Sequence, residues 1–212
     1  MYAVLMRSDV SRTRTVARRA IRAEVAAVAE RLFLTQGYDA TTIDAIAAEA
    51  GMSPRSVYRY FPTKDDILID RFARISESLS ATLQSRPAAE PPWDSLAASF
   101  RDLVEHADRS EGRDSALLMQ RAIISSPVVF GRYLQQLQVA QTVAVQVLSE
   151  RSGGATNESD DSVVVLNAIV GAAFGCLVAA QCVWARADVA EPFAAVLERA
   201  MAAVTPSPAL RD

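Results

Sequence analysis

The feature that most constrains this chain is the helical spacing of its apolar residues, which few glycines and prolines interrupt. The 212 residues include 8 Gly and 9 Pro, and most of these lie where the spacing breaks. Apolar residues three and four positions apart form one face of an α-helix. Only Val163-Val164-Val165 is typical of a strand, and the alanine-rich residues after it are not. The sequence therefore predicts an all-α fold of about nine helices.

Local signals give the approximate ends of these helices. Gly51 is a typical stop, Ser53 followed by Pro54 is a typical start, and residues 41–44 resemble a capping box. The expected helices are roughly 14–36, a short helix between Thr41 and Gly51, 54–60, 64–85 with a cap at 63–66, one from Trp93 to Ala107, 114–125, 126–151, 162–187 and 190–204.

Composition excludes several classes of function. Half of the residues are apolar, 22% are charged and the mean hydropathy is +0.11, which is typical of a folded protein with a sizeable core. Cys176 and Cys182 lie in one apolar stretch, which is neither a disulfide framework nor a metal-ligand spacing. His106 is the single histidine and has no evident catalytic partner. We therefore expect no enzyme, no metal site and no cofactor.

Charge divides the chain into two parts. Residues 1–64 carry ten Arg or Lys against six Asp or Glu, whereas residues 65–212 carry twelve against nineteen. A basic segment is suited to a polyanion such as nucleic acid. We therefore expect two domains with different tasks, 1–64 and 65–212, of which the first binds a polyanion.

One long segment raises the question of a membrane. Residues 162–185 carry no charge over a length that could span a bilayer. The segment contains Asn167, Gln181, Gly171 and Gly175, and its neighbours are amphipathic. We interpret it as a tightly packed helix of a cytoplasmic protein rather than as a membrane span.

Residues 41–61 carry the clearest functional signal. They predict two short helices joined by a glycine turn, which is a helix-turn-helix pattern. The second helix has little apolar surface beyond Val57 and Phe61, so its other side chains project outward. Arginine recognises guanine edges, and hydroxyls contact phosphates or bases. Lys64, at the start of the next helix, could hold a phosphate together with nearby backbone amides.

The flanking residues strengthen this pattern. Over roughly residues 16–70 the sequence closely resembles the tetracycline-repressor (TetR) family. The residues that carry the resemblance are Phe33, Gly37-Tyr38, Thr41-Thr42-Ile43, Ile46-Ala47, Ala50-Gly51-Met52-Ser53, Val57-Tyr58, Tyr60-Phe61, Lys64 and Leu68. The resemblance implies a homodimeric transcriptional repressor with an N-terminal three-helix reader of palindromic double-stranded DNA and a C-terminal bundle that binds a small molecule.

The reader helix and its surroundings supply the candidate DNA contacts. The expected DNA-binding residues are Arg18, Arg19, Thr42, Pro54, Arg55, Ser56, Tyr58, Arg59, Tyr60 and Lys64. Arg55 and Arg59 are the first candidates for reading bases. Tyr60 has the alternative of closing the small domain as a partly buried ring. Arg7, Arg12 and Arg14 extend the basic charge, either as a flexible arm on DNA or as a solvated leader. Arg22, like Arg18 and Arg19, would be held by the first helix and is expected to contact the DNA backbone.

The C-terminal part supplies two further sets of candidates. Gly171, Gly175 and Ala179 form a smooth ridge that suits close helix packing, and the resemblance implies dimerisation through the last two helices. The expected interface is Val170, Gly171, Phe174, Gly175, Val178, Ala179, Phe193, Val196, Leu197 and Ala200. The candidate ligand-binding residues, each of which could equally be plain core, are Trp93, Phe100, Met119, Phe130, Tyr133 and Phe174.

Two alternatives to a repressor stay open. The chain could be a helical interaction module that does not bind DNA, or an activator that uses the same reader domain. The basic reader helix argues against the interaction module. Binding to promoter-sized DNA would distinguish that module from a DNA-binding regulator.

Overall fold

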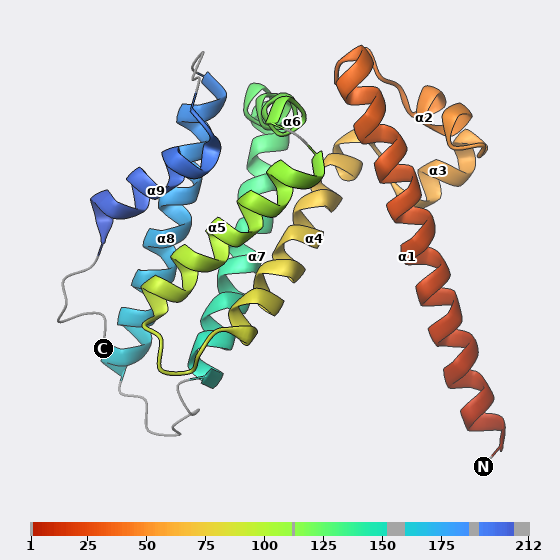
Figure 1. Ribbon diagram of the computed structural model, residues 1–212. Helices are drawn as coiled ribbons and strands as arrows, with labels where there is room; N and C mark the ends of the chain where they lie inside the picture. The colour runs from red at the N-terminus through yellow and green to blue at the C-terminus, as the bar shows by residue number, and fades with distance from the viewer. Residues whose placement is uncertain (1, 112, 152–159, 187–190, 206–212) are drawn as a thin grey trace. The chain divides into compact units, whose positions relative to one another are not determined.

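The computed structural model describes residues 2–111, 113–151, 160–186 and 191–205 (Figure 1). Every regular element within these ranges is an α-helix, which confirms the predicted fold class. The helices are α1 (Tyr2–Gln36), α2 (Ile43–Glu49), α3 (Pro54–Tyr60), α4 (Lys64–Ser85), α5 (Pro92–Glu111), α6 (Arg113–Ser125), α7 (Pro127–Arg151), α8 (Asp160–Arg186) and α9 (Phe193–Val204).

The chain forms two compact units, Met1–Arg71 and Phe72–Asp212. The division falls inside α4, whose first turns belong to the first unit. The expected boundary after Lys64 lies at the start of that same helix. The tasks assigned to the two domains remain predictions.

Caps and a glycine turn hold the short helices of the first unit. The Thr42 hydroxyl accepts a hydrogen bond from the Ala45 N–H at 3.1 Å and begins α2. Gly51 ends α2 with a φ of 64°, and the Met52 N–H donates to the Ala47 carbonyl at 2.9 Å. Only glycine adopts this left-handed conformation without strain. Thr41 is not part of the expected capping box, because its hydroxyl donates to the Gly37 carbonyl.

The first helix is much longer than the sequence analysis predicted. The expected start near residue 14 is wrong, because α1 already begins at Tyr2. No proline or glycine precedes Gly37, so the sequence contains nothing that would stop the helix earlier. The side chains of Arg7, Arg12 and Arg14 lie outside the described part of the structure, whereas their backbone is helical.

Helix α8 is the centre of the second unit and packs against α5, α6, α7 and α9. Aromatic contacts connect the elements. The Phe100 and Phe174 rings join α5 to α8 with centroids 5.2 Å apart, and the Phe72 and Tyr133 rings join α4 to α7 at 4.6 Å. The apolar side of α4 is buried at Phe72, Leu79 and Leu83, but Ile75 is 37% exposed and does not belong to it.

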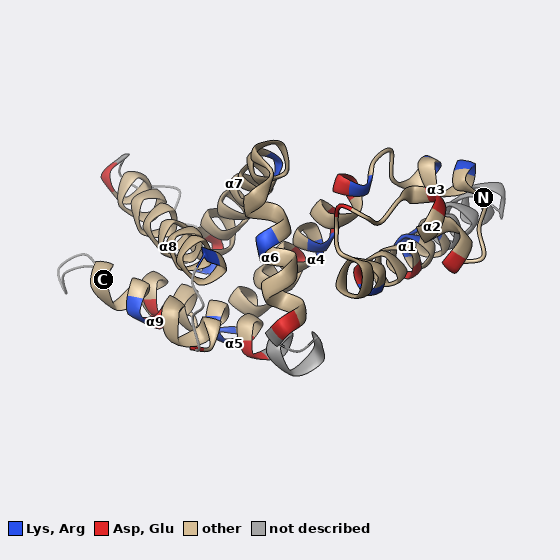
Figure 2. Ribbon diagram, turned by 90° about the horizontal axis from the view of Figure 1, so that it is seen from above, with Lys and Arg blue, Asp and Glu red and all other residues tan. Residues whose placement is uncertain are grey.

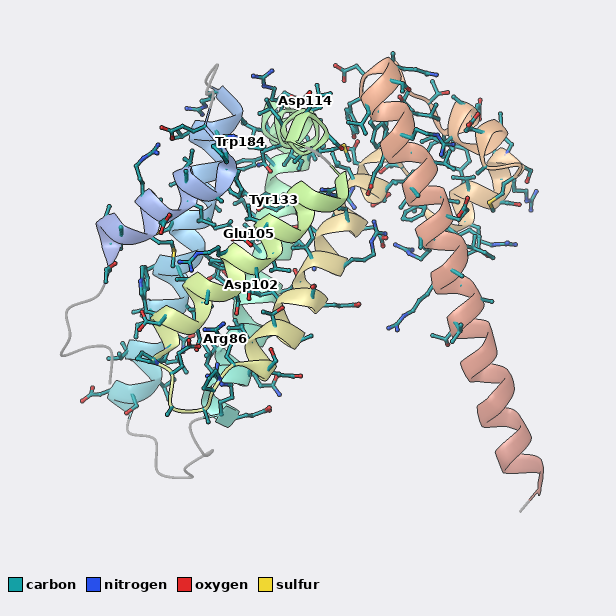
Figure 3. The ribbon with its side chains drawn as sticks, viewed as in Figure 1. Arg86, Asp102, Glu105, Asp114, Tyr133 and Trp184 are labelled. Carbon is teal, nitrogen blue, oxygen red and sulfur yellow. The ribbon has the colours of Figure 1, made fainter. Side chains whose placement is uncertain are left out.

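A polar cluster holds the end of α4 and the start of α5. Arg151, the last residue of α7, donates to the Leu83 carbonyl and to the Ser95 hydroxyl, both at 3.2 Å. Glu90 pairs with Arg86, which is labelled in Figure 3. It also accepts a hydrogen bond from Ser95 at 2.7 Å. These hydrogen bonds, above all the one from Arg86, lower the pKa of the Glu90 carboxyl against the opposing effect of burial.

The C-terminal elements follow the prediction with small shifts. Helix α9 begins at Phe193 rather than near residue 190. The interval between the expected helices 126–151 and 162–187 falls mainly on residues 152–159, which lie outside the described residues, as does the side chain of His106.

Candidate nucleic-acid interface

Helix α3 is anchored to the domain on one side and exposes its other side chains to solvent. The Ser53 hydroxyl caps it by accepting from the Ser56 N–H at 3.2 Å, and Pro54 occupies its first turn. Val57 and the following Phe61 are fully buried. Because these two anchors hold one side, the other side lies in solvent. The exposed set is Pro54, Arg55, Tyr58 and Arg59.

Tyr60 sits between the two roles that the sequence left open. It is half-buried, so its ring neither closes the domain completely nor stands fully in solvent. The Arg59 guanidinium lies 5.2 Å from the centre of this ring. Such a cation–π contact orients Arg59 at the end of α3. Ser56 is half-buried as well, and its hydroxyl lies 2.9 Å from that of Ser53.

The candidate phosphate contacts outside α3 are exposed. Thr42 lies in solvent at the start of α2, where its hydroxyl accepts the capping bond and keeps its own proton for donation. Arg18 and Arg19 are exposed on α1. These positions are available to a polyanion.

Lys64 has a contact set that the sequence analysis did not predict. Its ammonium donates to the backbone carbonyls of Tyr38 at 2.7 Å, Asp39 at 3.2 Å and Thr41 at 3.3 Å. It also lies 4.4 Å from the centre of the Tyr38 ring. An ammonium has three protons, so these carbonyls occupy its donors. In this structure Lys64 holds the turn between α1 and α2.

Arg22 is also used inside the first unit, contrary to its expected role as a phosphate contact. Its guanidinium pairs with Asp70 of α4, donates to the Tyr60 carbonyl at 2.8 Å and stacks 4.3 Å above the centre of the Phe61 ring. Arg22 therefore joins three helices. An arginine one helical turn before a buried valine, Val25 here, was the signal that could have indicated this inward role.

The geometry defines the class of protein. A short capped helix, a glycine turn and an exposed basic second helix form a helix-turn-helix, the arrangement that regulators use to enter the DNA major groove. Residues 25–70 match the sequence profile of a family described as "Bacterial regulatory proteins, tetR family". These residues of the chain therefore belong to this TetR family.

Relatives agree with this assignment. The chain is 30% identical over 126 residues to the HTH-type transcriptional regulator TcmR of Streptomyces glaucescens, a match that covers 58% of this chain and 56% of TcmR. The aligned segment thus spans about half the length of that curated relative.

Solved structures agree in fold. Thermus thermophilus FadR, a TetR-family repressor in complex with lauroyl-CoA, has a TM-score of 0.60 at 21% identity, covering 88% of this chain and 97% of that one. Bacillus subtilis FadR in complex with stearoyl-CoA has a TM-score of 0.55 at 18% identity, covering 84% and 95%.

The candidate ligand-binding residues lie in the core of the second unit. All are buried except Phe130, which is half-buried. Tyr133, labelled in Figure 3, is central. Its ring contacts those of Phe72 and Phe130, and its hydroxyl donates to Gln181 of α8 at 2.6 Å. Burial raises the pKa of Tyr133 well above its usual range, although the bond to Gln181 opposes the shift. The group is therefore a neutral donor at any physiological pH.

The expected dimer interface separates into two sets. Four residues, Val170, Phe174, Val196 and Leu197, are already buried within one chain, so they are core residues and not surface that a second copy could contact. The other six retain exposure. They are Gly171, Gly175, Val178, Ala179, Phe193 and Ala200.

Three buried polar side-chain atoms of the second unit lack a partner in the described structure. They are the Ser99 hydroxyl on α5, the Gln120 amide nitrogen on α6 and the Arg151 Nε at the end of α7. Such groups cost about 1–3 kcal/mol when unsatisfied. The described residues contain no group of three His, Cys, Asp or Glu that could hold a metal ion.

Proposed function

We propose that the protein is a transcriptional repressor of the cytoplasm that binds palindromic DNA as a homodimer and leaves it when a small molecule binds. The observation that carries this proposal is α3. It exposes Arg55, Tyr58 and Arg59 from a helix whose inner side is anchored by Val57 and Phe61. A rigid helix with exposed arginine guanidinium groups is suited to donate hydrogen bonds to base edges in the major groove.

The proposed contacts follow from exposure. Arg55 and Arg59 read base edges, with Pro54, Ser56 and Tyr58 beside them. Arg18, Arg19, Thr42 and Tyr60 contact phosphates. Lys64 instead positions the turn between α1 and α2, because its ammonium already serves three carbonyls.

The test selects bound sequences from random duplexes with the purified protein. Arg55→Ala or Arg59→Ala should then cost about 1–3 kcal/mol on the selected sequence and relax the preference at one position in each half-site. Arg101→Ala, an exposed arginine of the second unit, is the matched control and should leave binding unchanged. Unchanged sequence preference in both reader variants would remove α3 from the reading role. Failure to bind any duplex would favour an interaction module.

The dimer proposal rests on one uncovered face of α8. The helix carries no charge between Asp161 and Arg186, and only 33% of its most apolar stretch is buried within the chain. In Figure 2 it is tan along its length, with charged residues at its ends. By length and composition α8 could also cross a membrane. We assign its exposed face to a second copy of the chain, because a dimer binds two half-sites one duplex turn apart.

The ligand proposal rests on the interior of the second unit. Tyr133 contacts α4 through Phe72 and α8 through Gln181, so a molecule bound beside it would act on both helices. Helix α4 continues into the first unit, which gives the ligand a physical connection to the reader. The orphaned Gln120 amide could donate to an acceptor on an apolar or amphipathic ligand.

The two FadR neighbours carry acyl-CoA, so lauroyl-CoA is the first probe. A ligand that prefers the DNA-free form by about 2.7 kcal/mol lowers DNA affinity a hundredfold. Titration of lauroyl-CoA into the complex with the selected duplex measures this release. Gln120→Leu should weaken the response without changing DNA affinity in the absence of ligand. No release by lauroyl-CoA would exclude this acyl-CoA from the proposal.

A further inference from the structure

Helix α1 extends far beyond the core of the first unit. The first fully buried side chain in its described part is Val25, whereas every residue from Thr15 to Ala20 is exposed. The helix nevertheless begins at Tyr2. At about 1.5 Å per residue, the stretch before Arg22 is about 30 Å long. It needs an explanation that the packing of the domain does not supply.

Arg22 shows which way one face of this extension points. Its guanidinium donates to the carbonyl of Tyr60, the last residue of α3, and stacks on Phe61. Side chains separated by one helical turn share a face. The face of α1 that contains Arg22 is therefore the face directed to the end of the reader helix.

The arginines of the extension share that face. At about 100° per residue, all of them lie in an arc of about 160° centred on position 22. Asp9, the one acidic residue of this stretch, lies outside the arc. The arginine positions within the arc are 7, 12, 14, 18 and 19. Helical register thus continues the basic surface of the reader along the extension.

We infer that residues 2–20 form a rigid helical arm whose arginine face, the set just named, binds the phosphate backbone of duplex DNA that flanks the site read by α3. This inference rests on the proposed DNA binding and adds a contact outside the recognised sequence. An arm about 30 Å long matches about one turn of duplex, which measures about 34–36 Å. The contact is electrostatic, so it should depend on flank length and salt but not on flank sequence.

The opposite face of the arm carries apolar residues, among them Leu5, Met6, Val10 and Val16. A basic amphipathic helix can also lie on an anionic membrane. The structure favours DNA because the basic arc is continuous with the end of α3 through Arg22. The apolar side is interrupted by Asp9.

The test uses the full chain and two duplexes, one limited to the selected site and one extended by about ten base pairs, or one turn, at each end. Arg7→Gln with Arg14→Gln removes two charges and keeps the helix. The wild type should prefer the extended duplex, and this double variant should lose much of that preference. Its salt slope on the extended duplex should fall by about two per protomer, since each phosphate contact contributes about 0.9. Arg101→Gln with Arg186→Gln, two exposed arginines of the second unit, is the matched control.

A second variant separates helical placement from charge alone. Ala17→Pro keeps every charge and breaks α1 two turns before Val25, so the domain core should stay folded. We expect it to lose the preference for the extended duplex. A wild-type preference in this variant would overturn the rigid arm in favour of a flexible basic leader.

Other outcomes would also overturn the inference. An unchanged salt slope in the double arginine variant would do so, as would an equal loss on the two duplexes. Loss of binding to phosphatidylglycerol vesicles with unchanged DNA binding would assign the arm to a membrane surface. If the wild type bound neither duplex, the proposed DNA binding would fail together with the arm. If it bound both equally, only the arm would fail.

Discussion

Within each of the two units, a different kind of interaction holds the helices together. Hydrogen bonds and ion pairs, called polar locks below, join the helices of the first unit. Arg22 connects α1, α3 and α4, and Lys64 donates to three carbonyls of the turn between α1 and α2. The Arg71 guanidinium lies 3.5 Å from Glu30 of α1. The helices of the second unit meet mainly through apolar and aromatic side chains, such as Phe100 and Phe174. Its polar cluster is confined to one end, around Arg151 and Glu90.

This difference corresponds to what each unit has to present. Directional hydrogen bonds hold α3 in one orientation, which the proposed reading of bases by its side chains requires. Apolar packing is less directional. In the described part of the second unit it leaves an uncovered face on α8 and three buried polar atoms without a hydrogen-bond partner. Those features are suited to partners that the single chain does not contain.

The largest expected effect comes from removing the shared anchor of the first unit. Phe61 is fully buried beneath the Arg22 guanidinium. Phe61→Ala should cost about 3–5 kcal/mol, because it leaves a cavity and removes the stacking surface. Hydrogen exchange measured by mass spectrometry should show loss of protection across α2 and α3, with α5 and α8 unchanged.

A reciprocal variant controls for general destabilisation. Leu96 is fully buried on α5, so Leu96→Ala should cost about 2–5 kcal/mol in the second unit while α2 and α3 keep their protection. If either variant unprotected both units equally, the comparison would fail and the chain would unfold as one cooperative body.

The next effect concerns the uncovered face of α8. Within the described structure, no atom outside the glycine's own helix lies within 4 Å of the position of a Cβ at Gly175. Gly175→Leu should therefore leave a single chain folded. Against a symmetric partner helix it should overpack by about 1–3 kcal/mol per site. Sedimentation at micromolar concentration should show a dimer for the wild type and a monomer for this variant.

Gly131 supplies the control for this experiment. It also lies in a helix, α7, and among the described residues no atom beyond the backbone of that helix lies within 4 Å of the position of its Cβ. Gly131→Leu makes the same chemical change away from the proposed interface and should keep the dimer. A dimer unaffected by Gly175→Leu would move the interface to another face.

The sequence predicted the first unit better than the second because its signals are local. Ser53, Pro54 and Gly51 act on their own neighbours, and the structure has them as cap, first turn and stop. The sequence did not predict the roles of Lys64 and Arg22, since their partners lie 23–26 and 38–48 positions away along the chain. Basic residues beside a basic helix resemble phosphate contacts until their internal acceptors are known.

Periodicity alone could not divide the apolar residues of α8 between core and interface. Val170 and Phe174 share the composition of their exposed neighbours, and only the packing of α5 and α7 shows that they are buried. Ile75 likewise continues the apolar spacing of α4 and is nevertheless exposed, because the spacing does not show how wide the contact on the partner helix is. The early start of α1 was missed because helix ends without caps leave no local signal.

A smaller effect on stability is expected from removing the hydrogen bonds of Lys64, one of the polar locks of the first unit. Lys64→Met keeps the aliphatic stem and removes the three hydrogen bonds to carbonyls. We expect a loss of about 1–2 kcal/mol in the free energy of unfolding of the first unit, since charged hydrogen bonds contribute about 1.5–3 and this site is partly exposed. Urea denaturation without DNA measures it.

The salt dependence of DNA binding distinguishes the two roles of Lys64. If the residue only holds the turn, the slope of affinity against salt stays that of the wild type under conditions where the variant is folded. A slope lower by about one, with unchanged stability, would return Lys64 to the phosphate contacts.

The smallest effect concerns the polar cluster of the second unit and appears only as a pH dependence. Hydrogen bonds from Arg86 and Ser95 lower the pKa of Glu90 in the folded chain. A carboxyl with a lowered pKa stabilises the fold fully above its unfolded value of about 4.3, and this contribution is lost as the pH falls through that range. Glu90→Gln should thus cost about 0.5–1 kcal/mol at pH 7, a value kept small by the partial exposure of the pair. The difference from the wild type should shrink toward pH 4 or below.

Glu198→Gln, at an exposed residue of α9, controls for the loss of one negative charge. A difference independent of pH would mean that Glu90 acts through shape and neutral hydrogen bonding. The second unit would then owe its stability to packing without an ionic contribution from Glu90, and it would differ from the first unit even more.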